Sequence, residues 1–265
     1  MRAPDPALTA FIADELARPT LPEAGAFAAH LAERPGTAAV LFYGSCLQRG
    51  TTEGVLDFYV LTDGGDWGQG ALAAAAGRVL PPNVYVVAWK GLRAKVAVTR
   101  LADFGARCGL ETLDTTFWAR FCQRAAIVWA RNDEAERAAA EAVATSVETA
   151  AIWAARLAPG LQGAAAWRAL FARTYRVEIR PERKGRGDAI VDADEARFAR
   201  LWALTSPARS VAPPASANAW RARWWVGKPL HLGRLAKGAF TYEGGVRYLI
   251  WKIRRHRRDP SRQTR

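Results

Sequence analysis

A stretch from Phe42 to Asp63 reads FYGSCLQRGTTEGVLDFYVLTD. It begins inside an apolar run, Ala38–Tyr43, passes through a loop rich in glycine and threonine, and enters a second apolar run, Val55–Leu61. Short apolar runs bounded by turn residues are typical of buried strands. The sequence therefore predicts two strands side by side, with Gly44-Ser45 closing the first and Asp57 inside the second.

This arrangement suits the binding of a triphosphate. A Gly-Ser pair at the end of a strand lets the backbone approach phosphates closely and supplies N–H and hydroxyl donors. A carboxylate on the neighbouring strand can hold Mg²⁺ against the same phosphates. Gly44, Ser45 and Asp57 thus match the geometry of a nucleotidyltransferase. The alternative is that Gly44-Ser45 is only a tight turn and Asp57 a charge at a strand edge.

Asp57 lies between Leu56 and Phe58 in an otherwise apolar strand. An unpaired carboxylate there is costly, so a cation or a lysine partner is expected. In the usual nucleotidyltransferase pattern a second carboxylate follows two residues after the first, but Tyr59 occupies that position here. We therefore expect Asp57 and Asp63 to hold the metal, with Asp66 as the next nearest candidate.

Lys95 is the candidate partner for the phosphates. It falls in a predicted strand, Arg93–Thr99, that we expect beside the strand of Asp57. From there its ammonium group can offset the charge of the triphosphate and of the pyrophosphate leaving group. The alternative is a solvated lysine at the edge of the sheet.

The rest of the chain predicts a mixed sheet with flanking helices. The other strands are expected at Val84–Trp89 and Ala125–Ala130, with Lys90-Gly91 as a hairpin turn after the first of them. Helices are expected in the first ~35 residues and over Trp67–Val79, Leu101–Cys108, Thr115–Phe121, Ala164–Tyr175 and Ala196–Leu204. Asn132 is expected to cap a further, long helix that ends at Pro159-Gly160.

We predict an α/β (α+β) fold in four parts. Residues 1–132 form a nucleotidyltransferase-like domain, and residues 133–205 form a mainly helical second domain. Residues 206–218, with three prolines and few large apolar side chains, form a linker or mobile loop. Residues 219–265 form a basic segment that ends in an amphipathic helix.

Charge is concentrated in that last segment. The chain of 265 residues has a net charge of +13, and from Ser206 onward it holds 14 Lys/Arg residues against two acidic ones. Basic side chains there alternate with apolar ones, as in a helix lying on anionic lipid. The residues expected to bind the membrane are Arg247, Trp251, Lys252, Arg254 and Arg255. The same composition suits RNA or DNA, and Trp220, Trp224 and Trp225 suit either an interface or a core.

Other features limit the class of protein. No apolar run approaches the ~20 residues of a spanning helix. Asp5, Asp14 and Glu15 interrupt the N-terminus where a signal peptide is basic and then apolar. Three cysteines without C-x-x-C spacing and three scattered histidines point to a reducing cytosol and to no structural zinc.

Several motifs in order resemble one enzyme family, the translocator-assembly-and-maintenance type of phosphatidate cytidylyltransferase. The matching segments are Tyr43-Gly44-Ser45, Leu56-Asp57-Phe58 with Asp63, Asn83-Val84-Tyr85, Gly91 to Lys95, Tyr175 with Glu178 and Arg180, and Gly238 to Thr241 with Gly244 and the basic run. The resemblance extends from about Ala38 to Arg258. The chain departs from the family pattern at Cys46, at Val96-Ala97 and at Val177-Glu178.

The resemblance implies transfer of a cytidylyl group from CTP to phosphatidic acid, with Mg²⁺, giving CDP-diacylglycerol and pyrophosphate. It also implies that Glu178 and Arg180 contact a substrate phosphate. We expect a cytoplasmic enzyme, peripheral on the inner face of the cell membrane, with no specific nucleic-acid partner. The alternatives are a nucleotidyltransferase that acts on RNA or a small molecule, and a non-enzymatic nucleic-acid-binding protein.

Overall fold

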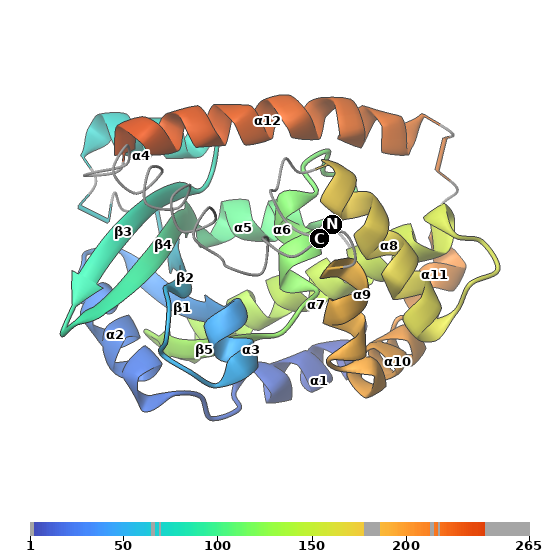
Figure 1. The fold of residues 1–265 in the computed structure, drawn as a ribbon, viewed down its shortest axis with the longest axis horizontal. Coiled ribbons are helices and arrows are strands. Elements are labelled where there is room, and N and C mark those ends of the chain that lie inside the picture. The colour runs from blue at the N-terminus through green and yellow to red at the C-terminus, as the bar shows by residue number, and fades with distance from the viewer. Residues whose placement is uncertain are drawn as a thin grey trace, which may run out of the picture.

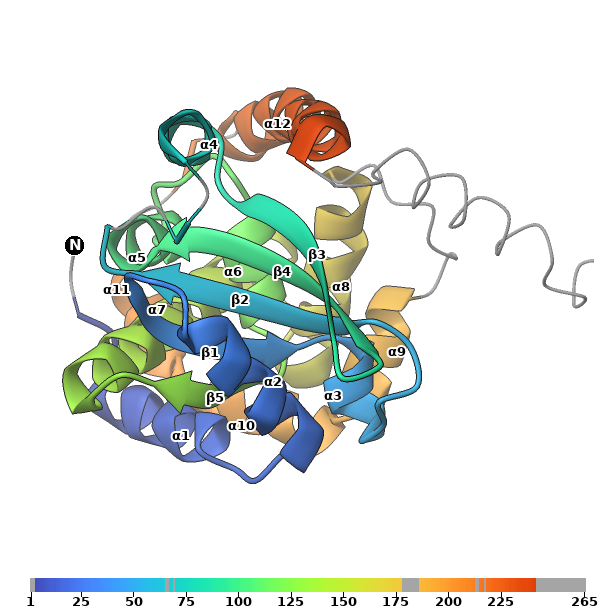
Figure 2. The same cartoon turned by 90° about the vertical axis from the view of Figure 1, so that its left-hand side faces the viewer.

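A computed structural model of the chain describes residues 3–64, 67–68, 70–177, 186–212, 215–216 and 218–241. At its centre is a five-stranded sheet in the order β3-β4-β2-β1-β5 (Figures 1 and 2). The strands are β1 (Thr37–Tyr43), β2 (Leu56–Thr62), β3 (Asn83–Trp89), β4 (Leu92–Arg100) and β5 (Ala125–Ala130). β2 and β4 run parallel, and the other neighbouring pairs in this sheet are antiparallel. All five predicted strands are confirmed, each within one residue of the predicted ends.

Helices cover both faces of the sheet. The first part of the chain supplies α1 (Pro6–Leu16), α2 (Pro22–Ala32), α3 (Ser45–Arg49), α4 (Ala71–Val79), α5 (Leu101–Cys108) and α6 (Thr116–Phe121). The later part supplies α7 (Asp133–Leu157), α8 (Gly163–Val177), α9 (Arg186–Asp192), α10 (Glu195–Leu204), α11 (Ser206–Val211) and α12 (Ala219–Thr241). The predicted mixed α/β fold with a helical region after the sheet is therefore confirmed.

Alternation along the strands sends neighbouring side chains to opposite faces. On one face Phe42, Phe58 and Val96 pack with Phe27 of α2. On the other face the strands contribute to a larger buried cluster shared with α1, α5, α6, α7, α8 and α10. The helices after residue 132 thus pack into the same core as the sheet.

Local signals in the sequence explain several element boundaries. The side chain of Asn132 accepts a hydrogen bond from the backbone N–H of Ala135, as predicted for the cap of α7. Lys90 and Gly91 both have positive φ angles, of 46° and 78°, which suits the tight turn between β3 and β4.

The predicted linker at 206–218 is wrong over its first half. The structure forms α11 there, beginning at Ser206 with Pro207 in its first turn, where proline's lack of an N–H costs nothing. Ala208 of this helix is buried. Three prolines favour a loop in general, but Pro207 stands at the start of a helix, a position at which proline is compatible with the helix.

The N-terminal half of α12 is bound to α7. Trp220 packs on Trp153, with ring centroids 5.4 Å apart, and the guanidinium of Arg223 lies 4.2 Å from the centroid of the same ring. Arg223 also donates a hydrogen bond of 2.7 Å to the carbonyl of Leu110. Trp220 therefore packs into the core, one of the two roles that the sequence left open for it.

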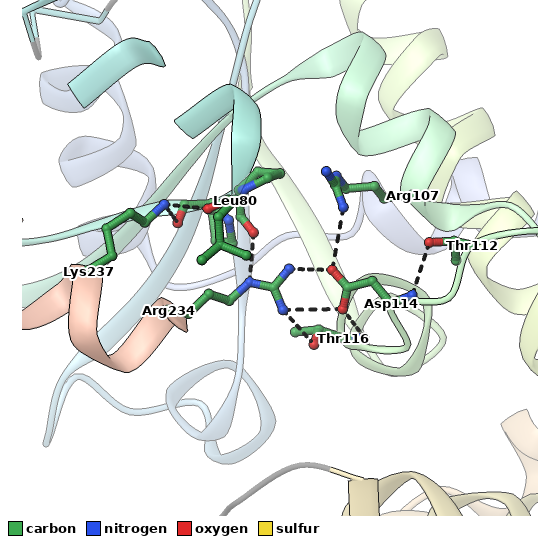
Figure 3. A network of polar contacts seen from close by, with 9 residues as sticks. Leu80, Arg107, Thr112, Asp114, Thr116, Arg234 and Lys237 are labelled. Carbon is green, nitrogen blue, oxygen red and sulfur yellow. Dashed lines mark hydrogen bonds and ion pairs between the residues drawn. The ribbon is translucent and has the colours of Figure 1, made fainter. Parts of the chain in front are cut away.

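Two cationic side chains of α12 attach the C-terminal half of this helix to the rest of the protein (Figure 3). Arg234 pairs with the buried Asp114 and donates from Nε to the carbonyl of Pro81 at 2.8 Å. Lys237 donates to the carbonyls of Leu80 and Pro82 and to the side chain of Asn83. A long helix thus lies along the outside of the molecule and is held to the loop before β3 (Figure 1).

Two ionisable side chains in this contact, Asp114 and Lys237, have shifted pKa values. Burial acts to raise the pKa of Asp114, but the hydrogen bonds and charge of Arg234 outweigh it and hold that pKa below its usual value. Burial, aided by the nearby Arg234, lowers the pKa of Lys237 to about 8. The contact is therefore sensitive to both strongly acidic and moderately alkaline pH.

No helix among the described residues is long and apolar enough to cross a membrane. The predicted amphipathic helix with Arg247, Trp251, Lys252, Arg254 and Arg255 lies outside the described residues.

Candidate functional site

Two of the predicted site residues, Asp57 and Lys95, meet at one end of the sheet. Tyr43, the last residue of β1, lies opposite Asp57 in β2, and Asp57 lies in register with Lys95 in β4. Neighbouring strands are about 4.8 Å apart, and residues in register point to the same face. The cationic neighbour expected for Asp57 is thus Lys95, and both side chains are half-buried.

Gly44 is required where the chain leaves β1. Its φ is +85°, a conformation that side chains rarely adopt. A Cβ atom at this position would lie only 2.7 Å from Oδ2 of Asp57. The absence of a side chain at Gly44 therefore makes the space that the carboxylate of Asp57 occupies.

Ser45 begins the short helix α3, which the sequence did not predict. The next residue, Cys46, is buried, and its thiol donates to the carbonyl of Val55 at 3.5 Å. Burial raises the pKa of this thiol, so it stays protonated near neutral pH. Cys46 thus helps to hold the loop between Gly44 and Asp57.

Arg120 of α6 is a site residue that sequence reasoning missed. Its guanidinium donates to the hydroxyl of Tyr43 at 3.3 Å and lies 5.4 Å from the centroid of that ring. Nearby, Tyr59 is fully buried, and burial raises its pKa well above the ordinary value. Arg120 comes from a segment with no motif, so only the fold could reveal that it reaches the end of β1.

The predicted pairing of Asp57 and Asp63 on one metal is wrong. Asp63 follows the other end of β2, six residues from Asp57. At about 3.3 Å per residue the two positions are about 20 Å apart. Asp63 instead forms an ion pair of 2.5 Å with Arg131. Nearness in sequence was misleading because a strand is extended.

The remaining predicted site residues cannot be placed. Asp66, Glu178 and Arg180 lie outside the described residues. Within the described part of the chain, no group of three or more His, Cys, Asp or Glu side chains could hold a metal ion. Asp57 is therefore the one predicted metal ligand that the structure places beside Gly44 and Ser45.

A cavity of about 710 Å³ opens beside Ser45. Its walls come from α3, from the start of β5, from the connection between α1 and α2, and from α9 and α10. Ser45 thus belongs both to the lining of this cavity and to the turn beside Asp57. The cavity lies on the β5 side of that turn, whereas Lys95 lies on the β4 side.

Comparison with known proteins adds little. No family model matches the chain, and no curated protein does. One solved structure that resembles it is a nucleotidyltransferase-like protein from Exiguobacterium sibiricum, with 13% identity and a TM-score of 0.30 over 82% of this chain and 76% of that one. The likeness is too low to assign a function, so function has to be inferred from the site itself.

Proposed function

We propose that this protein is a nucleotidyltransferase that joins a nucleoside monophosphate to a phosphate-bearing acceptor. The observation that carries the proposal is the meeting of Gly44, Asp57 and Lys95 at one end of the sheet. A turn without a side chain, a carboxylate and an ammonium group on one face are what a metal-bound triphosphate needs.

Mg²⁺ fits the donors at this place. It is usually bound in proteins by one or two carboxylates together with substrate phosphates and water. Asp57 supplies one carboxylate, and the absence of a side chain at Gly44 leaves that carboxylate its place beside the turn. When bound, Mg²⁺ offsets the charge that develops on the phosphates during transfer.

The residues of the chain then have separate tasks. Gly44 and Ser45 hold the α-phosphate against Asp57, and Lys95 attracts the two phosphates that leave. An acceptor oxygen attacks the α-phosphorus, the bond from that phosphorus to the bridging oxygen breaks, and pyrophosphate leaves with the electron pair. A phosphate monoester is already anionic at pH 7, so the reaction needs no strong general base.

The finer assignment is CTP and phosphatidic acid, giving CDP-diacylglycerol and pyrophosphate. It is supported by the sequence resemblance and by the outer face of α12. Trp225 and Leu232 lie on that face, seven residues apart, with 65% and 54% of their surface exposed. Arg221 and Lys228 flank them, and residues 219–241 contain no acidic side chain.

An exposed tryptophan and leucine among cations match the surface of an anionic bilayer, where the aromatic ring lies at the headgroups. We therefore propose that the protein acts at the inner face of the cell membrane as a peripheral protein. The membrane contact would then include the outer face of α12 as well as the basic segment that follows it in the sequence.

The test is transfer of label into lipid. Each of the four α-labelled ribonucleoside triphosphates is incubated with the protein, Mg²⁺ and vesicles that contain phosphatidic acid, and the products are extracted into organic solvent. We expect label in the lipid fraction from CTP, and none with the Asp57→Asn protein. Label in added RNA would favour the RNA-modifying alternative, and no transfer from any triphosphate would overturn the proposal.

A further inference from the structure

The cavity beside Ser45 is lined by more positive than negative charge. Among the described residues that line it, four are arginines and two, Glu15 and Asp194, are acidic. Both acids are already neutralised: Glu15 by the buried Arg197 at 2.9 Å, and Asp194 by Arg124 at 2.5 Å. The described residues of the cavity therefore carry an excess of two positive charges.

That excess belongs to Arg18 and Arg49. Arg49 donates to the carbonyls of Ser45, at 3.2 Å, and of Glu53, at 3.5 Å, which leaves its charge unneutralised. Within the described part of the chain, neither arginine forms an ion pair. Guanidinium groups are the side chains best suited to bind phosphate with two parallel hydrogen bonds.

Another part of the described lining is apolar. It is formed by Ile190 with small alanines of β5 and α9. Phe198 is the one aromatic residue among the described residues of the lining, and it is only 2% exposed. The described lining thus offers little aromatic surface for stacking a nucleobase, but it combines this apolar strip with cationic side chains.

The position of the cavity suits the binding of the acceptor, the substrate that carries the attacking oxygen. In phosphoryl-type transfer the attacking and leaving oxygens lie roughly in line on opposite sides of the phosphorus. Lys95 lies on the β4 side of Asp57, whereas the cavity lies beyond Ser45 on the β5 side. A pyrophosphate that leaves toward Lys95 therefore requires a nucleophile that arrives from the cavity.

We infer that this cavity binds the acceptor, a phosphate monoester with an apolar body. Arg18 and Arg49 hold its phosphate near Ser45, and the apolar body lies along Ile190. The inference rests on the proposed function and deepens it, since it separates the acceptor subsite from the nucleotide subsite. The bond formed joins an oxygen of this phosphate to the α-phosphorus, and the bond broken releases pyrophosphate.

Direct binding tests the inference without turnover. Calorimetry measures the affinity of dihexanoyl phosphatidic acid, of glycerol 3-phosphate and of a non-hydrolysable CTP analogue with Mg²⁺. The proteins are the wild type, Arg18→Gln, Arg49→Gln and the control Arg137→Gln. This control removes an exposed guanidinium on α7, whose hydrogen bond within the described structure is to a backbone carbonyl.

We expect each of the two cavity substitutions to weaken phosphatidic acid binding about tenfold, which corresponds to about 1.4 kcal/mol. Affinity for the CTP analogue and all affinities of the control should stay at wild-type values. Dihexanoyl phosphatidic acid should bind more tightly than glycerol 3-phosphate, because only the lipid has an apolar body for the strip along Ile190.

Three results would overturn the inference: no phosphate monoester binding by the wild type, unchanged binding in both variants, or weakened binding of the CTP analogue instead. Equal affinity for the lipid and for glycerol 3-phosphate would overturn its apolar part. Arginine-dependent lipid binding without any nucleotidyl transfer by the wild type would support the cavity assignment and contradict the proposed function.

Discussion

Asp57 and Lys95 lie in register on two neighbouring strands, β2 and β4, which run parallel. Both side chains therefore leave the sheet on the same face, at the end where Gly44 makes room for the carboxylate. Residues 57 and 95 belong to strands separated by the whole of α4 and β3. The sheet order, and not sequence distance, brings opposite charges together at the candidate site.

Asn in place of Asp57 should abolish transfer, whereas Asn in place of Asp63 should not. Asp57→Asn removes the charge that holds the metal and keeps the shape, so we expect a loss of about a thousandfold or more in rate. Asp63 lies about 20 Å away along β2, so Asp63→Asn should keep the wild-type rate. Initial rates of label transfer measure both, with circular dichroism to verify folding. Equal loss in the two variants would contradict the placement of the site.

Gly44→Ala should inactivate the protein by displacing Asp57. The new Cβ would lie 2.7 Å from Oδ2 of Asp57, so the carboxylate has to move. Gly160→Ala is the matched control, because Gly160 also has a positive φ, of 94°, but nothing lies within 4 Å of its Cβ position. Each substitution should cost about 1 kcal/mol of stability from backbone strain. Only Gly44→Ala should lose transfer activity, and full activity in that variant would refute the role of the turn.

Serine in place of Trp225 or Leu232 should weaken adsorption to anionic vesicles. Each exposed apolar side chain that enters a bilayer surface contributes on the order of 2 kcal/mol, so each substitution should reduce binding more than tenfold. Adsorption should also fall as salt is added. Flotation measures both effects. Leu161→Ser, which changes an exposed leucine outside α12, is the control; an equal effect there would contradict a specific role for α12.

Stability should rise with pH where Lys237 titrates. Its pKa is about 8 in the folded protein and about 10.4 in an unfolded chain. Between these values the unfolded state binds more protons, so the free energy of unfolding increases with pH. Below pH 8 the unfavourable charged form is present in both states. The gain should be on the order of 1 kcal/mol, since solvent screens the half-buried group.

The measurement compares denaturant unfolding of the wild type and Lys237→Met between pH 7 and 10.5. The difference in unfolding free energy should shift in favour of the wild type as pH rises, since other titrating groups contribute equally to both proteins. A difference that stays constant with pH would show that Lys237 keeps an ordinary pKa in the folded protein.

The sequence predicted the strands well because each is a short apolar run between turn residues. It correctly placed Gly44-Ser45 directly after one strand and Asp57 in the adjacent strand, since a short loop between strands favours an antiparallel pair. It also expected Lys95 beside Asp57, which the parallel pairing of β2 and β4 confirms. The catalytic roles of these residues stay predictions.

Other features depend on contacts that no local pattern contains. Helix α3 is five residues long and lies in a segment that composition describes as a loop. Arg120 reaches Tyr43 across 77 residues of sequence. The sequence around Trp220 is similar in composition to the sequence around Trp225, but the two side chains lie on different faces of α12. Trp220 packs on Trp153, whereas Trp225 is exposed.

The buried ion pair between Glu15 and Arg197 has a consequence for how the chain is made. It joins α1 to α10 across 182 residues, and both side chains are at least nine-tenths buried. During synthesis Glu15 leaves the ribosome long before Arg197, and its carboxylate cannot be buried without a counter-charge. We therefore expect α1 to dock only after most of the protein has emerged, so that the first completed element of the chain is among the last to reach its native place.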